Sequence, residues 1–366
     1  MGASMAAGKL FGPANSANLY NFSLTAEEIL SGAGSTDRTF GYIREFHRTK
    51  PINPATGRKN PTVVNLSLGT LNTLTGASFI HFQGADLDAG SGNLISAADL
   101  HARAIYASDP NWTSNSDFWV VSNTPNSDMV DAIDEGVIVV TSAGNSNVYI
   151  DVPGGDNYDN YIVGDTGYLN KDYFFNGYYP FRDYYHRGDN YVINGGICVG
   201  ALSSHSNESK ASFSSWGPGV DVYAAGEKVA GAADNNEIAF GIPYPGQENN
   251  QPNWDTLGFS QGTSYSSPYV AGLVACLAEI YPNLTNDQAR TWLHNNAVTG
   301  LMLDTGEDIT VDVNTRVSIG GLDIDRIVLW KNHKKVVGYT ANNTYGINGR
   351  PASGAVYPRV KKRLRG

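Results

Sequence analysis

The chain has few cysteines, few charged residues and no long apolar run. Cys198 and Cys276 are the only 2 cysteines among 366 residues. Both stand in apolar runs, so we expect buried free thiols and exclude a disulfide framework. No apolar run approaches the roughly 18 residues that would span a membrane. The first nine residues also lack the basic start and the long apolar stretch of a signal peptide.

The negative net charge argues against nucleic acid as a partner. Charged residues make up 16% of the chain, and the formal net charge is −10. The exception is the basic stretch 359–365, which we interpret as a solvated tail, with docking as the alternative. Glycine (41 residues) and tyrosine (21 residues) are abundant, which is typical of a loop-rich globular protein.

Strands and helices alternate along most of the chain. Apolar runs typical of buried parallel strands occupy residues 62–69, 136–145 and 197–201. Helical patterns occupy residues 127–135, 283–297 and part of 25–50, and a further strand is expected at 18–24. This alternation predicts an α/β fold with a parallel sheet and flanking helices. In such sheets the functional site lies at the carboxyl ends of the strands.

Composition divides the chain into two regions. Residues 1–300 carry the α/β pattern, and a segment rich in Tyr, Asn and Gly interrupts it at 147–195. We interpret this segment as a surface insertion that either covers or contacts a site, or is a packed structural loop. Residues 301–366 partly alternate apolar and polar residues, which predicts a small β-rich extension ending in the basic tail.

The most informative motif is Gly-Thr-Ser-x-x-x-Pro at residues 262–268, followed at once by the helical apolar run 269–277. Ser264 therefore stands on a glycine turn at a helix start. There the backbone N–H groups are unpaired and the helix dipole is positive. A negative charge developing on a bound acyl group would be stabilised at this position. The motif predicts a nucleophilic serine.

Four blocks in this order resemble the subtilisin-like serine proteases, the subtilases. The blocks are Gly12–Tyr20, Val63–Gly69, Ser142–Asn145, and Ala211–Pro218 taken together with the Ser264 motif. The resemblance spans roughly residues 4–300 and implies a subtilisin-like three-layer α/β fold. The related sedolisins share the serine motif but have an aspartate in the oxyanion hole, so Asn145 favours the subtilases.

The resemblance implies site residues only where a motif matches. Ser264 would be the nucleophile, and the side-chain amide of Asn145 would form the oxyanion hole with the backbone N–H of Ser264. The segment Ser67-Leu68-Gly69 would hold the substrate backbone as an added strand. Ala143 and Gly144, next to the oxyanion asparagine, would be further substrate contacts. The implied partner is a peptide or protein substrate.

The subtilase pattern also requires a His-Gly-Thr block, which supplies the base, and an earlier aspartate that orients the histidine. No His-Gly-Thr is present among the 7 histidines of the chain. Family spacing before Gly12 would put this block immediately before Met1. We therefore expect the aspartate and histidine on an N-terminal segment encoded by the same gene. His186, in the Tyr-rich segment, is the histidine best suited to a substrate contact.

These observations leave two functions open. The first is a serine endopeptidase that acts through a Ser264 acyl-enzyme, which intact Ser264 and Asn145 favour. The second is a catalytically inactive subtilase-like binding or structural module, which the missing base favours. The chain alone is expected to be inactive, because a serine without a base stays protonated and weakly nucleophilic.

Cofactor and location are less constrained by the sequence. No metal-binding cluster is recognisable, and Ca²⁺ enters only through the family resemblance, without a calcium loop that can be identified. The Tyr-rich segment and the basic tail resemble subtilase-like proteins encoded by bacteriophages. This likeness favours a cytoplasmic or phage-associated location.

Overall fold

A parallel sheet forms the centre of the computed structural model, which describes residues 1–8, 12–22, 35–69, 71–74, 77–88, 95, 118–121, 126–164, 183–203, 210–232 and 257–297. The 4-stranded sheet has the order β12-β11-β8-β3, and each neighbouring pair is parallel. Its strands are β3 (Val63–Leu66), β8 (Ile138–Ser142), β11 (Ile197–Leu202) and β12 (Val222–Ala225). The predicted parallel α/β sheet is therefore confirmed.

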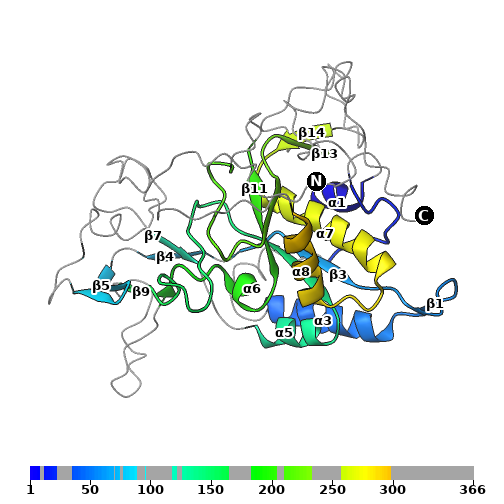
Figure 1. The fold of residues 1–366 in the computed structure, drawn as a ribbon, viewed down its shortest axis with the longest axis horizontal. Helices are drawn as coiled ribbons and strands as arrows, with labels where there is room; N and C mark the ends of the chain where they lie inside the picture. The colour runs from blue at the N-terminus through cyan, green and yellow to red at the C-terminus, as the bar shows by residue number, and fades with distance from the viewer. Residues whose placement is uncertain are drawn as a thin grey trace.

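Helices cover both faces of this sheet, which gives three layers (Figure 1). The helices are α1 (Gly2–Ala7), α3 (Ser35–Thr49), α5 (Ser127–Asp134), α6 (Asn190–Ile193), α7 (Thr263–Ile280) and α8 (Asn286–Asn296). Because successive side chains of a strand point to opposite faces, β8 supplies two cores. Ile138 and Val140 pack with the layer of α7 and α8, whereas Val139 packs with α3 and α5.

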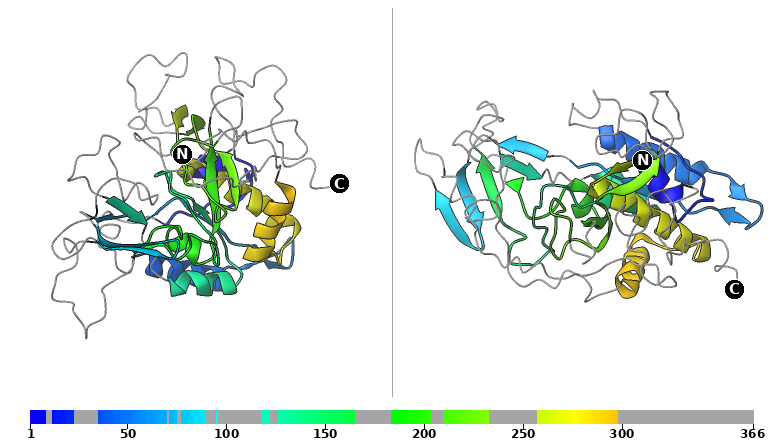
Figure 2. Two further views of the ribbon diagram at one scale, coloured as in Figure 1. Left: turned by 60° about the vertical axis from the view of Figure 1, so that its left-hand side comes forward. Right: turned by 90° about the horizontal axis from the view of Figure 1, so that it is seen from above.

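Antiparallel strands outside the central sheet were not expected from the sequence, and one group of them lies at one end of the molecule (Figure 2). One sheet has the order β10-β9-β5-β6 and contains β5 (Ala77–Phe82), β6 (Ala85–Asp88), β9 (Tyr161–Gly164) and β10 (Asp183–Tyr184). Three two-stranded pairs are β1–β2 (Ile52–Asn53, Arg58–Lys59), β4–β7 (Leu71–Leu74, Phe118–Val121) and β13–β14 (Val229–Ala232, Leu257–Ser260). Strands β9 and β10 come from the Tyr-rich segment, and Ile162 and Tyr185 of that segment are buried against Ala77 and Ile80.

The predicted helices agree with the structure, whereas the first predicted strand does not. The helices expected at 127–135 and 283–297 are confirmed as α5 and α8, and α3 confirms the second half of 25–50. The strand expected at 18–24 is wrong for residues 18–22, which form no strand. Leu19 and Tyr20 there are exposed by 57% and 63%, so their apolar pattern does not mark a buried strand. Residues 23–34 and the extension 301–366 lie outside the described residues.

Both cysteines are buried and free, as the sequence predicts. Burial raises the pKa of the Cys198 thiol far above its ordinary value, and raises the pKa of Cys276 to about 12. Among the described helices, none combines the length and the apolar character needed to cross a membrane.

Helix α1 packs closely against α7 and runs in the same direction. A Cβ atom on Gly2 would lie 3.9 Å from Cγ of Pro268, and four residues later the carbonyl oxygen of Ala6 approaches Gly272. A Cβ atom on Gly272 would lie only 2.3 Å from that oxygen. Met5 of α1 is fully buried in the α7 core cluster. The absence of a side chain at Gly272 therefore allows the two helices to approach.

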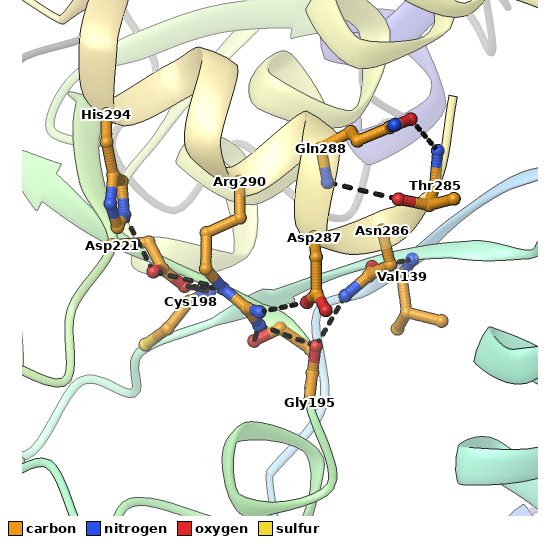
Figure 3. A network of polar contacts seen from close by, with 11 residues as sticks. Val139, Gly195, Cys198, Asp221, Thr285, Asn286, Asp287, Gln288, Arg290 and His294 are labelled. Carbon is orange, nitrogen blue, oxygen red and sulfur yellow. Dashed lines mark hydrogen bonds and ion pairs between the residues drawn. The ribbon is translucent and has the colours of Figure 1, made fainter. Parts of the chain in front are cut away.

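Helix α8 binds the amino ends of three parallel strands, and its own start is fixed by local sequence (Figure 3). Thr285 Oγ1 accepts the Gln288 N–H at 3.2 Å, and Gln288 Oε1 accepts the Thr285 N–H at 3.0 Å. This capping box satisfies donors that a helix start otherwise leaves unpaired. The next residue, Asn286, accepts the N–H of Val139 in β8 at 3.0 Å and donates to the carbonyl of Gly195 at 2.8 Å.

Charged residues extend this attachment to β11 and β12. Asp221, just before β12, accepts the N–H of Cys198 in β11 at 2.8 Å. The same carboxylate pairs with Arg290 at 3.2 Å and with His294 at 2.9 Å, both on α8 (Figure 3). Arg290 also donates to the carbonyl of Gly195 at 2.7 Å. The amino end of the sheet is thus held firmly by α8, and the opposite end carries the candidate site.

Substitution of Gly272 by alanine should destabilise the protein. The new Cβ would meet backbone that cannot move aside, and overpacking of this kind costs about 1–3 kcal/mol. Gly41→Ala in α3 is the matched control, because a Cβ there meets nothing within 4 Å. It should stabilise the helix by about 0.5–1 kcal/mol. Urea unfolding of both variants measures the two changes, and a loss of stability at both positions would contradict the packing argument.

Substitution of Asn286 by alanine should cost about 1–3 kcal/mol, because it leaves the buried N–H of Val139 without an acceptor. Asn296→Ala, at the other end of α8, is the control and should change stability by less than about 0.5 kcal/mol. Thermal unfolding of the two variants gives the comparison. Equal losses would show that the Asn286 contacts do not hold the sheet.

Candidate active site

The site begins at the start of α7, where a glycine sets the backbone geometry. Gly262 has φ +141° and ψ 154°, a region that essentially only glycine adopts. Its N–H donates to the carbonyl of Gly226 at 2.7 Å. Ser264 follows as the second helical residue and is partly exposed. Among the described residues its hydroxyl has no hydrogen-bond partner, and an N–H at this helical position has no partner within the helix.

Asn145 lies beside this helix start, with its side-chain orientation fixed by Thr263. Its Oδ1 accepts the backbone N–H of Thr263 at 2.8 Å and the hydroxyl of the same residue at 2.9 Å. A backbone N–H can only donate, so the atom facing it must be the amide oxygen. Nδ2 therefore points away from Thr263, and a Cβ on Gly262 would lie 3.3 Å from it. Within the described part of the chain, Nδ2 donates to no acceptor.

The loop that carries Asn145 is held on both sides. Gly144, with φ +96°, donates its N–H to Thr263 Oγ1 at 3.2 Å and accepts the N–H of Ser215 at 3.0 Å. Ala143 is only 8% exposed, and its N–H donates to the carbonyl of Val199 at 2.9 Å. Its side chain lies in a core cluster. Ala143 therefore holds the loop in place and presents no side chain to a ligand.

The end of β3 meets the same helix start. Ser67 Oγ donates to the backbone carbonyl of Ser264 at 2.9 Å, and it lies 3.1 Å from the hydroxyl of Ser267. Leu68 and Gly69 follow in exposed positions outside any helix or strand. The structure thus brings Ser67, Gly144, Asn145 and Ser264 together at the carboxyl ends of β3 and β8, and the Ser67-Leu68-Gly69 segment leads away from them.

Asp189 lies next to this segment and was not identified from the sequence. The residue is 7% exposed, and its Oδ1 accepts the N–H groups of Tyr191 and Val192 at 3.0 and 3.1 Å, which caps α6. Burial raises the pKa of the carboxyl to about 7, and the two N–H groups oppose that shift. A Cβ on Gly69 would lie 3.0 Å from Oδ2. The sequence signals the cap, but no local pattern reveals a neighbour 120 residues away.

The described histidines are engaged away from Ser264. They are paired as His47–Thr62 (2.8 Å), His81–Asp86 (2.6 Å), His186–Asn160 (3.1 Å) and His294–Asp221 (2.9 Å). His186 is fully buried against the rings of Tyr149 and Tyr185. Its interpretation as a substrate contact is therefore wrong, because the aromatic residues around it form a core. His101, His205 and His333 lie outside the described residues.

Comparisons with known proteins point to one family. A sequence profile described as the Subtilase family matches residues 2–346. Fervidolysin from Fervidobacterium pennivorans is 30% identical over 169 residues, which are 45% of this chain and 19% of that protein. Subtilisin BL from Lederbergia lenta is 33% identical over 101 residues, 28% of this chain and 30% of that protein. The matched parts thus span less than a third of these relatives.

Among solved structures, a cold adapted subtilisin-like serine proteinase aligns with a TM-score of 0.43 and 18% identity. The alignment covers 86% of this chain and 71% of that chain.

Replacement of Asp189 by asparagine should stabilise the protein above neutral pH. The raised pKa means that the folded state binds the carboxyl proton more tightly than the unfolded state does. The cost of ionising the buried group therefore grows as pH rises from about 4 to about 7, and is complete above that, at roughly 4 kcal/mol as an upper figure. An asparagine side chain would cap α6 as well as the aspartate does.

Thermal unfolding of both proteins from pH 4 to pH 8 tests this expectation. The stability gain of Asp189→Asn should be near zero at the acid end and largest at pH 8. A difference that does not vary with pH would contradict a raised pKa of the buried carboxyl.

Proposed function

The chain belongs to the subtilase family, and we propose that it is a serine endopeptidase in which Ser264 attacks the peptide carbonyl. The hydroxyl of Ser264 stands at the amino end of an 18-residue helix and is partly exposed. Attack forms a bond from Oγ to the carbonyl carbon and gives an acyl-enzyme when the amine leaves, which water then hydrolyses. The location of the hydroxyl supports this role, because negative charge is stabilised at a helix start.

The observation that carries the proposal is the fixed orientation of Asn145. Thr263 binds the amide oxygen through two donors, so Nδ2 remains as a donor directed past Gly262. The oxyanion of the tetrahedral intermediate would accept from Nδ2 and from the backbone N–H of Ser264. A donor that is already oriented loses no free energy to reorganisation during the reaction. A turn asparagine would not need this pair of contacts.

The substrate backbone would lie along Ser67-Leu68-Gly69 as an added strand. Ser67 is fixed to the helix start through the carbonyl of Ser264, while the two following residues are exposed. The exposed segment would pair its backbone N–H and C=O groups with those of a peptide. This contact would hold the scissile carbonyl near Ser264 and near Nδ2 of Asn145.

The base is the remaining requirement, and the packing of α1 against α7 supports one position for it. Helices α1 and α7 run in the same direction, with Gly2 beside Pro268 and Ala6 beside Gly272. One helical turn before Pro268 is Ser264, and one turn before Gly2 is the position four residues upstream. A histidine there would lie beside Ser264. We therefore propose that the base enters at the amino end of α1, on an N-terminal segment of the same gene.

A binding or structural module is the second candidate. It is favoured by the described histidines, all of which have partners away from Ser264. In this alternative the exposed Leu68 and Gly69 would still bind a peptide strand, but Ser264 would not hydrolyse it. The two functions therefore differ in catalysis and agree in the partner, a peptide or protein.

Calcium stays an expectation from the family resemblance alone. In the described part of the chain no three His, Cys, Asp or Glu side chains gather as a metal site would require. The location predicted from the composition, cytoplasmic or phage-associated, stays a prediction.

Placing His-Gly-Thr directly before Met1 should raise Ser264-dependent peptide hydrolysis by about 10- to 100-fold over an Ala-Gly-Thr extension. This figure follows from mutant subtilisin, where loss of the histidine costs about 2 × 10⁶ in turnover and loss of the aspartate about 3 × 10⁴. Hydrolysis of a chromogenic peptide measures the difference, and Ser264→Ala in each extended chain supplies the background. Equal rates for the two extensions would contradict the proposed position of the base.

A further inference from the structure

One oxygen of the Asp189 carboxyl accepts hydrogen bonds from the backbone, and the other faces the segment Ser67-Leu68-Gly69. Both of its hydrogen bonds go to Oδ1, from Tyr191 and Val192. Within the described residues Oδ2 accepts no hydrogen bond, although the residue is only 7% exposed. Oδ2 lies against Gly69, where a Cβ would come within 3.0 Å. An acceptor on a buried residue is therefore left open beside a residue that has no side chain.

The spacing of two contacts along the Ser67-Leu68-Gly69 segment suits a long side chain. Ser67 Oγ bonds to the backbone carbonyl of Ser264, and Gly69 lies beside Asp189 Oδ2, so the two contacts are two residues apart along the chain. Two residues of chain span at most about 7 Å. A lysine or arginine side chain reaches over such a length with an apolar stem and carries its charge at the tip. The stem would pass Gly69, and the tip would meet Oδ2.

A capping role alone does not explain an aspartate at this position. Asparagine or serine would cap α6 equally well, without the desolvation that raises the pKa of Asp189 to about 7. A strongly perturbed carboxyl beside a candidate site is a feature of functional positions. A carboxyl that costs stability where a neutral residue would cap the helix points to a function for its charge.

We propose that Asp189 is a specificity-determining residue that accepts the positive charge of an arginine or lysine side chain of the substrate. The cation would bind Oδ2 beside Gly69, on the residue whose carbonyl Ser264 attacks. The proposal rests on the proposed function, because it requires the substrate backbone on Ser67-Leu68-Gly69. Asp189 does not touch the reacting atoms, so it sets which bond is cleaved and takes no part in the chemistry.

Peptide binding tests the proposal without turnover. Three fluorescent peptides would differ at one position only, which holds arginine, citrulline or leucine. Citrulline has nearly the shape of arginine but no charge. Fluorescence anisotropy at pH 8 gives the Kd of each peptide for the full chain carrying Ser264→Ala, alone and combined with Asp189→Asn. Asp156→Asn is the matched control, since it removes the same charge from an exposed position in the same segment.

The arginine peptide should bind about 10- to 100-fold more tightly than the citrulline peptide, the range expected for a hydrogen bond between charged groups. Asp189→Asn should reduce this ratio to about one and leave the leucine peptide unchanged, whereas Asp156→Asn should preserve the ratio. Equal binding of arginine and citrulline peptides, with the leucine peptide also bound, would overturn the role of Asp189 alone. Failure of every peptide to bind would overturn the proposed substrate segment as well.

Discussion

The contacts of Thr263 are the interaction on which the candidate site depends. This one residue accepts the Gly144 N–H and donates twice to Asn145, so it joins the end of β8 to the first turn of α7. These bonds orient the amide of Asn145 relative to the start of α7. Thr263 is fully buried, which keeps water from competing for the same groups. The geometry around Ser264 is therefore a property of the core.

The rest of the fold holds the two joined elements still. α8 binds the amino ends of β8, β11 and β12 through Asn286, Arg290 and Asp221, at the end of the sheet opposite Ser264. The long helix α7 starts at the site and is followed by α8 at the opposite end of the sheet. It packs against the sheet on one side and against α1 on the other. A site on rigid elements needs little adjustment when substrate binds, and its loops are free to set specificity.

Much of this arrangement could be predicted from the sequence where the cause is local. The capping box at Thr285, the apolar strand 138–142 and the glycine turn before Ser264 are each readable from neighbouring residues. The failures have a physical reason in common. Residues 18–22 read as a strand, but a strand needs a partner that the local pattern cannot supply. His186 and Asp189 depend on neighbours from distant parts of the chain, so neither the burial of the first nor the contact of the second with Gly69 has a local signal.

The central claim is that Ser264 and Asn145 act together on a peptide carbonyl. A crystal structure of the chain extended by His-Gly-Thr, in complex with a peptidyl boronic acid, tests it most directly. The account predicts a covalent bond from Ser264 Oγ to boron and a boronate oxygen about 2.7–3.1 Å from Nδ2 of Asn145, with the peptide paired along Ser67-Leu68-Gly69. A boronate bound elsewhere, or an adduct with Asn145 turned away from it, would contradict the account.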